Sequence, residues 1–128
     1  MTLARLSLSL AAGCALGAAA LMPAQAAARM NFDGNWSVLI VTKSGPCDQA
    51  YRYGLSIRGG RVFYEGSAAV NVAGQVSPTG AVNVRVWAGA QSANGAGRLS
   101  QDYGGGNWRG SGSSGSCSGT WTAERRGS

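Results

Sequence analysis

A chain of 128 residues has room for one domain and no more. Its 11 Lys and Arg against 5 Asp and Glu give a net charge of +6, which favours anionic partners in general without selecting one. The absence of histidine excludes a Ser-His-Asp triad and zinc sites of the usual type, and the five carboxylates show no spacing that strand geometry would bring together. We therefore expect a protein that is not an enzyme and that has no cofactor or metal.

The first residues have the organisation of a secretory signal peptide. Arg5 supplies a short positive region, residues 6–21 form an apolar run, and Ala24-Gln25-Ala26 offers the small-x-small pattern that signal peptidase cuts. The apolar run is shorter than the roughly 20 residues that a membrane-spanning helix needs. We predict a signal peptide over residues 1–26, cleaved after Ala26, and a single domain over residues 27–128.

Three cysteines remain to be placed. Gly13-Cys14 resembles the end of a lipid-attachment box, but an apolar stretch follows it where a lipidated terminus would meet a polar tether, so we expect Cys14 to leave with the signal peptide. An even pair in an exported domain favours a disulfide, which predicts a Cys47–Cys117 bridge and a periplasmic or secreted protein. The bridge closes a loop of 117 − 47 = 70 residues, a restraint of roughly 4 kcal/mol on the unfolded chain.

After the signal peptide, the first strand is predicted over residues 35–42 and the first hairpin over residues 51–66. Tyr51, Tyr53, Leu55 and Ile57 alternate with small and charged residues, which is typical of a half-buried strand. Gly59-Gly60 favours a two-residue type I′ turn, because both positions of that turn require positive φ. Residues 61–66 are then the returning strand.

A second hairpin follows the same logic. Valines alternate with polar residues over 70–76 and again over 82–87, and Ser77-Pro78-Thr79-Gly80 has proline and glycine where a β-turn favours them. Residues 90–100, 107–112 and 117–124 complete about eight short strands. We predict an all-β fold, an antiparallel up-and-down β-barrel closed by its first and last strands, with an open β-sandwich as the alternative.

Residues 104–119 are so rich in Gly and Ser that a flexible linker is an alternative to strands. Trp108, Arg109 and Cys117 lie within this stretch, and a disulfide would tie a linker to a strand. We therefore prefer strands in which missing side chains let the backbone bend, or let a large ring from elsewhere fill the space.

Three segments share a Gly-x-Trp pattern, at residues 34–36, 106–108 and 119–121. The first resembles the Gly-x-Trp that closes one end of lipocalin and avidin-type barrels, in which an arginine from the last strand packs over the indole. The resemblance implies this role for Arg125 or Arg126.

A wider resemblance covers nearly all of the chain after the signal peptide. It is to small secreted proteins of rhizobial and related alphaproteobacterial genomes, some of which carry haem-utilisation or adhesion labels. The motifs that carry it are FDGNW at 32–36, VTxxGxC at 41–47, YRY at 51–53, GxVSxxG at 74–80, GRLS at 97–100 and CSGTWTAERR at 117–126. The resemblance implies little about activity.

We expect a non-catalytic binding module that takes a small apolar ligand inside the barrel, or an anionic surface or polymer on its arginine-rich exterior. The candidate contacts combine rings with cationic groups, and Trp87 is included because it interrupts the polar face of its strand. They are Tyr51, Arg52, Tyr53, Trp87, Trp108 and Arg109.

Two other functions stay open. The first is binding of a protein partner, such as inhibition of a secreted protease by an extended segment over residues 27–31, on analogy of fold alone. The second is haem binding through a tyrosine or methionine, since no histidine exists; the candidates are Tyr51, Tyr53, Tyr64 and Met30. Interleaved rings and arginines also fit single-stranded nucleic acid, but export argues against that partner.

Overall fold

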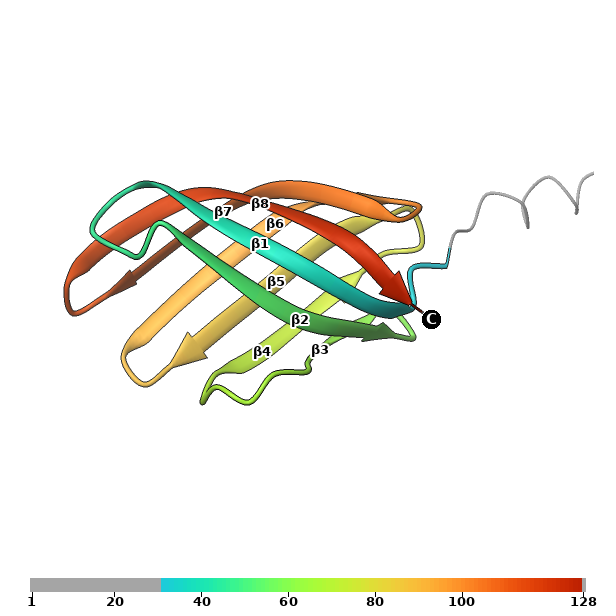
Figure 1. Cartoon of the computed structure of the whole chain (residues 1–128), viewed down its shortest axis with the longest axis horizontal. Coiled ribbons are helices and arrows are strands. Elements are labelled where there is room, and N and C mark those ends of the chain that lie inside the picture. Colours follow the sequence, from blue (N-terminus) through green and yellow to red (C-terminus); the bar gives the residue numbers. More distant parts are fainter. Residues whose placement is uncertain (1–30, 128) are drawn as a thin grey trace, which may run out of the picture.

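The computed structural model describes residues 31–127, and the predicted signal peptide lies outside these residues. Eight antiparallel strands follow one another around a closed barrel, each paired with its neighbour in the sequence (Figure 1). The strands are β1 (Gly34–Ser44), β2 (Ala50–Arg58), β3 (Arg61–Tyr64), β4 (Asn71–Val76), β5 (Ala81–Ala88), β6 (Gln91–Ser100), β7 (Tyr103–Gly112) and β8 (Gly115–Gly127). The predicted up-and-down barrel is confirmed, and the sandwich is not formed.

Closure joins the first strand to the last. β1 pairs with β8 from Asn35 opposite Gly127 to Ser44 opposite Ser118, with register shifts near both ends of the pairing. At one end of the barrel lie the C-terminus, the start of β1 and three tight turns; at the other lie the β1–β2 and β3–β4 loops and two turns (Figure 1). The two ends are built differently.

Both predicted turns are present at the first end. Gly59 and Gly60 have φ of 59° and 78°, the positive values that a type I′ turn requires. The Asp33 carboxylate accepts hydrogen bonds from their two backbone N–H groups, at 2.9 and 3.4 Å. In the second turn the Gly80 N–H donates to the Ser77 carbonyl over 2.9 Å. Local turn chemistry therefore sets the register of two hairpins.

The same end is closed by a ring and a cation. Trp36 and Phe32 are buried, and the Trp36 indole N–H donates to the Phe32 carbonyl at 2.9 Å. The Arg125 guanidinium lies 4.9 Å from the centre of the Trp36 ring and donates to the carbonyls of Asn31, Asp33 and Gln101. Of the two arginines that the lipocalin-like resemblance suggested, Arg125 has this position, while Arg126 is exposed.

The barrel interior is filled by alternate residues of every strand, as period-two alternation predicts. Valines from β3, β4 and β5 pack in one cluster with Ile57, Leu99 and the large rings of Trp36 and Trp121. The buried apolar core comprises Phe32, Trp36, Val38, Ile57, Val62, Val76, Val82, Leu99, Trp121 and Ala123.

Glycine makes room for these rings. A Cβ atom on Gly97 would lie 2.6 Å from Cζ2 of Trp121, and one on Gly106 would lie 2.8 Å from its Nε1. Residues 103–112 and 115–127 are strands, so the Gly/Ser-rich stretch is not a linker. The prediction of strands thinned by glycine to admit a large ring is confirmed.

The predicted disulfide joins Cys47, in the β1–β2 loop, to the buried Cys117 of β8, with the two Cα atoms 6.2 Å apart. Gly45 has φ of 100°, and a Cβ there would lie 2.7 Å from the Cα of Cys117. The loop therefore packs tightly on β8, and the bridge fixes it at the second end of the barrel.

Candidate binding site at the open end

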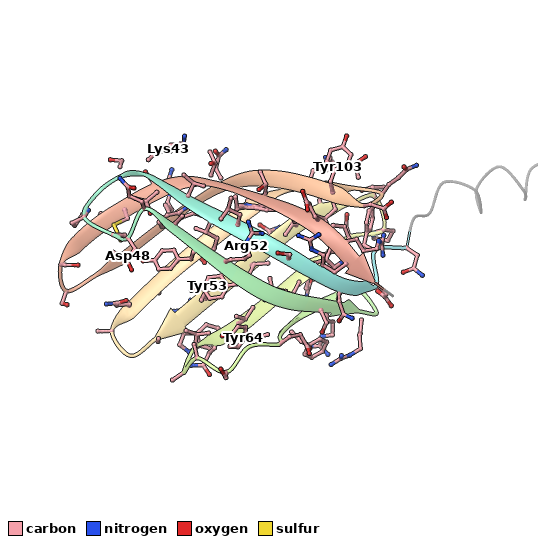
Figure 2. All side chains as sticks on the ribbon, viewed as in Figure 1. Lys43, Asp48, Arg52, Tyr53, Tyr64 and Tyr103 are labelled. Carbon is pink, nitrogen blue, oxygen red and sulfur yellow. A yellow bond between two sulfur atoms is a disulfide. The ribbon has the colours of Figure 1, made fainter. Side chains whose placement is uncertain are left out.

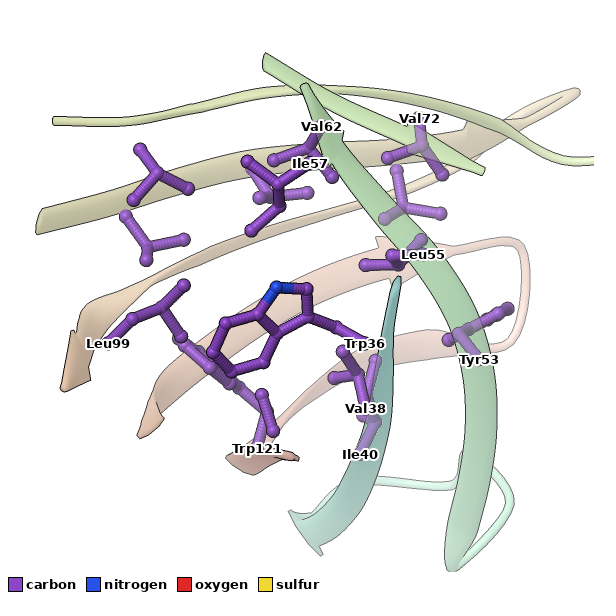
Figure 3. A pocket seen from close by; sticks show the side chains of 15 residues that line it. Trp36, Val38, Ile40, Tyr53, Leu55, Ile57, Val62, Val72, Leu99 and Trp121 are labelled. Carbon is purple, nitrogen blue, oxygen red and sulfur yellow. The ribbon is translucent and has the colours of Figure 1, made fainter. Parts of the chain in front are cut away.

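An apolar cavity of about 90 Å³ lies inside the barrel. Figure 3 shows Trp36, Val38 and Leu55 pointing into it from β1 and β2, together with Leu99 of β6 and Trp121 of β8. All the lining side chains are apolar or aromatic. Ligand pockets usually have about 300 to 1,000 Å³, so this cavity alone is too small for a drug-sized molecule.

A larger hollow of about 520 Å³ lies at the end of the barrel that carries the disulfide. Ile40, Tyr53, Val84 and Val86 line both the hollow and the inner cavity, so the two spaces are adjacent. Its rim includes Pro46, Cys47 and Asp48 of the β1–β2 loop, and Asp48 lies beside the disulfide in Figure 2. This end is open, whereas Trp36 and Arg125 close the other.

Three tyrosines form a cluster on the inner face of β2 and β3. The ring of Tyr51 stacks on that of Tyr53 with centroids 6.3 Å apart, and the ring of Tyr64 meets Tyr53 edge-on at 6.0 Å. The Tyr64 hydroxyl accepts a hydrogen bond from the Ala68 N–H at 3.1 Å, which ties the β3–β4 loop to the cluster. Burial, with smaller contributions from Tyr51 and Tyr64, raises the pKa of Tyr53 above its ordinary value of 10.0.

Trp108 supplies a large ring on the opposite wall. It is paired with Gly95 of β6 and Gly119 of β8, so neither neighbouring strand presents a side chain beside it. Its indole N–H donates to the Val41 carbonyl over 3.1 Å, across 67 residues of sequence. The hydrogen bond fixes the ring, and Trp108 lines the hollow.

The predicted candidate residues divide between two surfaces. Tyr51, Tyr53 and Trp108 come together inside the open end. Arg52 and Arg109 lie on the outer surface, and Arg52 donates from Nη1 to the Ser37 hydroxyl at 3.0 Å. The alternation of the strand separates Arg52 from the two tyrosines that flank it, so no guanidinium accompanies the phenol groups inside.

Trp87 lies at the boundary between these surfaces. It lines the rim of the hollow, while the Arg85 guanidinium lies 5.1 Å from the centre of its ring on the outer wall. Trp87 interrupts the polar face of its strand in the sequence, and in the structure it lies at the rim of the hollow.

The charge of the hollow contrasts with that of the whole chain. No Lys or Arg is among the described residues that line it, and Asp48 is its one charged residue. Lys43 and the arginines of β2 to β7 lie on the exposed outer side of their strands. The lining of the hollow therefore offers an anionic ligand no cationic partner.

Several lining residues were not among the sequence-based candidates. Ile40 was expected only within a strand and Val84 and Val86 only on one face of a strand, and Ala93 of β6 was not singled out. Alternation identifies which side of a strand they occupy, but their depth in the barrel depends on the tilt and register of all eight strands.

The other proposed sites have fewer structural features. Within residues 31–127 no group of three or more His, Cys, Asp or Glu side chains is placed to hold a metal ion. The segment expected to insert into a protease covers residues 27–31, of which residues 27–30 lie outside the described residues. The Asn31 carbonyl accepts a hydrogen bond from Arg125. The haem-ligand candidate Met30 also lies outside the described residues. Residues 31–127 contain no helix long and apolar enough to cross a membrane.

Comparison with known proteins gives no neighbour from which to transfer a function: no protein-family model, curated protein or solved structure matches the chain. The disulfide fits a periplasmic or extracellular location.

Proposed function

We propose that the protein is an exported, non-catalytic binding module that takes a small, neutral, apolar ligand through the open end of its barrel. The observation that carries the proposal is the hollow of about 520 Å³, which shares Ile40, Tyr53, Val84 and Val86 with the apolar inner cavity and lies at the barrel end away from Trp36 and Arg125. Its volume is within the usual range for ligand pockets. Export is part of the proposal and is supported by the signal-peptide pattern and the disulfide.

The lining specifies the class of ligand. Tyr53 and Trp108 present aromatic faces from opposite walls, which suits a planar or aromatic body. The tyrosine hydroxyls can hydrogen-bond to a polar group on the ligand, and Val84 and Val86 add apolar lining that the hollow shares with the inner cavity. A carboxylate or sulfonate on the ligand would meet Asp48 and no cation in the described lining, and burying it without a partner is costly.

The test compares two dyes of one skeleton. N-phenyl-1-naphthylamine is neutral, and 8-anilino-1-naphthalenesulfonate carries a sulfonate on the same rings. We expect the neutral dye to bind at least about tenfold more tightly in a fluorescence titration, a difference of about 1.4 kcal/mol.

Matched variants place the dye. Ala93→Leu fills the hollow from β6, whereas Ala96→Leu adds the same atoms on the exposed outer face of the same strand. The first variant should weaken binding of the neutral dye at least about tenfold and the second should leave it unchanged, because only the first removes volume from the site. Equal affinities in the two variants, or no dye binding at all, would contradict the proposal.

A further inference from the structure

A second concave surface lies on the outside of the barrel, across β3, β4, β5 and β6. It is a groove of about 660 Å³ whose outward side chains are Arg61, Phe63, Gln75, Asn83, Arg85 and Asn94. Ala73, which pairs with Arg85, lines this groove together with Phe63, and its small side chain leaves the groove open. We propose that this groove binds an acidic polysaccharide.

The cross-strand register sets the groups in two rows. Arg61 of β3 pairs with Gln75 of β4, which pairs in turn with Asn83 of β5. In the next row Arg85 pairs with Asn94 of β6. Four adjacent strands span roughly 14 Å at 4.7–4.9 Å per strand. The groove is therefore long enough to meet more than one group along an extended chain.

The groove is cationic and lacks counter-charges. The sequence has no Asp or Glu from residue 66 to residue 101. Ion pairs in the described structure involve Arg58, Arg125 and Arg126, and none involves Arg61 or Arg85. An arginine with no carboxylate of its own has its guanidinium donors available for one on a ligand, and that pair is commonly bidentate.

The amides extend recognition beyond charge. Each side chain of Gln75, Asn83 and Asn94 offers two donors and an acceptor. Over residues 31–127 their amide groups make no hydrogen bond to another protein group, although Asn71 nearby donates to the Trp87 carbonyl at 3.4 Å. Hydroxyl groups, which both donate and accept, match such amides. A chain that carries both carboxylates and hydroxyls is a polyuronate or a similar acidic polysaccharide.

Single-stranded nucleic acid is the competing polymer, and the groove suits it less well. Binders of that kind stack successive bases on successive exposed rings. Here the Arg58 guanidinium lies over the Phe63 ring at 4.5 Å, and Arg85 lies over Trp87 at 5.1 Å. Both rings already have a cation on one face, and amides rather than rings occupy the space between the arginines.

The groove shares Val84, Asn94 and Gly95 with the hollow at the open end, but its two arginines line the groove alone. Arg61 and Arg85 point outward, while Val62 and Val84, next to them in sequence, point inward to the apolar cavity. Changing the outer pair alters no side chain that lines the proposed ligand site. The inference therefore does not depend on the proposed function, and the two can fail separately.

The test titrates the purified, disulfide-bonded protein calorimetrically with oligogalacturonate, with its methyl-esterified, uncharged counterpart, and with a dT oligonucleotide of matched charge. We expect the uronate to bind most tightly and the ester at least about tenfold more weakly. R61Q/R85Q should reduce affinity for the uronate at least about tenfold. K43Q/R52Q, which removes the same charge from the β1–β2 wall, should change it by less than about twofold.

Three outcomes overturn the inference. Equal losses in the two double variants would mean that net charge alone acts. Tighter binding of the dT oligonucleotide than of the uronate would assign the groove to nucleic acid. No binding of the uronate in low salt would leave the groove without the stated ligand. Urea unfolding of R61Q/R85Q followed by tryptophan fluorescence shows whether that variant is folded, so this test does not depend on dye binding at the open end.

Discussion

Removing the Arg125 side chain should destabilise the whole barrel, since this one group joins three separate parts of the chain. Its guanidinium lies over Trp36 and donates to Asn31 and Asp33 ahead of β1, and to Gln101 in the β6–β7 turn. Its side chain is only 18% exposed, although it also pairs with Asp102 at 3.0 Å. We predict that Arg125→Ala lowers the free energy of unfolding by about 3 kcal/mol.

The magnitude follows from the separate contacts. A partly desolvated cation over an indole contributes about 1 kcal/mol. A hydrogen bond from a charged donor to the half-buried Asp33 carbonyl contributes about 1.5 kcal/mol. The carbonyls of Asn31 and Gln101 are exposed and can bond to water, and Asp102 is 78% exposed, so these partners add little. Lost packing of the Arg125 stem on Trp36 makes up the remainder.

Urea unfolding followed by tryptophan fluorescence measures the effect, and about 3 kcal/mol corresponds to a fall in Tm of roughly 15 °C. Arg126→Ala is the matched control, because that arginine is 58% exposed and pairs only with Glu124 at 3.3 Å. The control should cost less than about 0.5 kcal/mol. Arg125→Lys keeps the charge but not the planar fork and should fall between the two. Equal stabilities for Arg125→Ala and Arg126→Ala would refute the reasoning.

Three further outcomes are expected. Replacing both disulfide cysteines by serine should lower the free energy of unfolding by about 4 kcal/mol, since the 70-residue loop is no longer closed; unchanged urea midpoints in oxidised and reduced protein would contradict this. Gly106→Ala should cost about 1 to 3 kcal/mol, because its Cβ would clash with the Ala96 carbonyl oxygen and lie 2.8 Å from the Trp121 indole nitrogen, whereas Gly54→Ala, with 3.9 Å to its nearest neighbour, should be nearly neutral in the same assay. The pKa of Tyr53 is raised, so the stability that this phenol contributes is complete below pH 10.0, its ordinary pKa, and is lost as pH rises through the folded-state pKa. Tyr53→Phe should therefore flatten the alkaline decline in the free energy of unfolding. Identical pH profiles for the two proteins would contradict this prediction.

Much of the fold could be predicted because it depends on local chemistry. The pair Gly59-Gly60 favours only a few turn types, and alternation assigned Tyr51 and Tyr53 to the inner face before any partner strand was known. The two cysteines left after the predicted cleavage had one possible pairing within the chain. These features need no knowledge of the partner strands.

The strand ends were predicted less well, for identifiable reasons. Residues 61–66 were expected as one strand, but β3 ends at Tyr64, and the Tyr64 ring occupies the space where a side chain of residue 66 would lie. β7 begins at Tyr103, four residues before the predicted start at residue 107, because the glycines there pair with β6 and β8 without contributing an apolar pattern. Missing side chains remove the signal that alternation provides.

The binding surfaces needed the three-dimensional structure. Tyr53 and Trp108 are 55 positions apart (108 − 53) and line the same hollow because β1 and β8 pair to close the barrel. The outer groove exists because Ala73 lies between larger neighbours on adjacent strands, and its amides have no distinctive spacing in the sequence. Register and closure, which arise from long-range pairing, bring both sets of residues together.

The most direct test of ligand binding at the open end uses the four tryptophan indole N–H signals in a ¹H–¹⁵N spectrum during titration with N-phenyl-1-naphthylamine. Trp108 reports on the open end, Trp36 on the closed end and Trp87 on the rim and outer wall. We predict that the Trp108 signal shifts most and that the Trp36 signal, whose N–H is bonded to Phe32, stays in place. Shifts confined to Trp87, or none at saturating dye, would contradict the account.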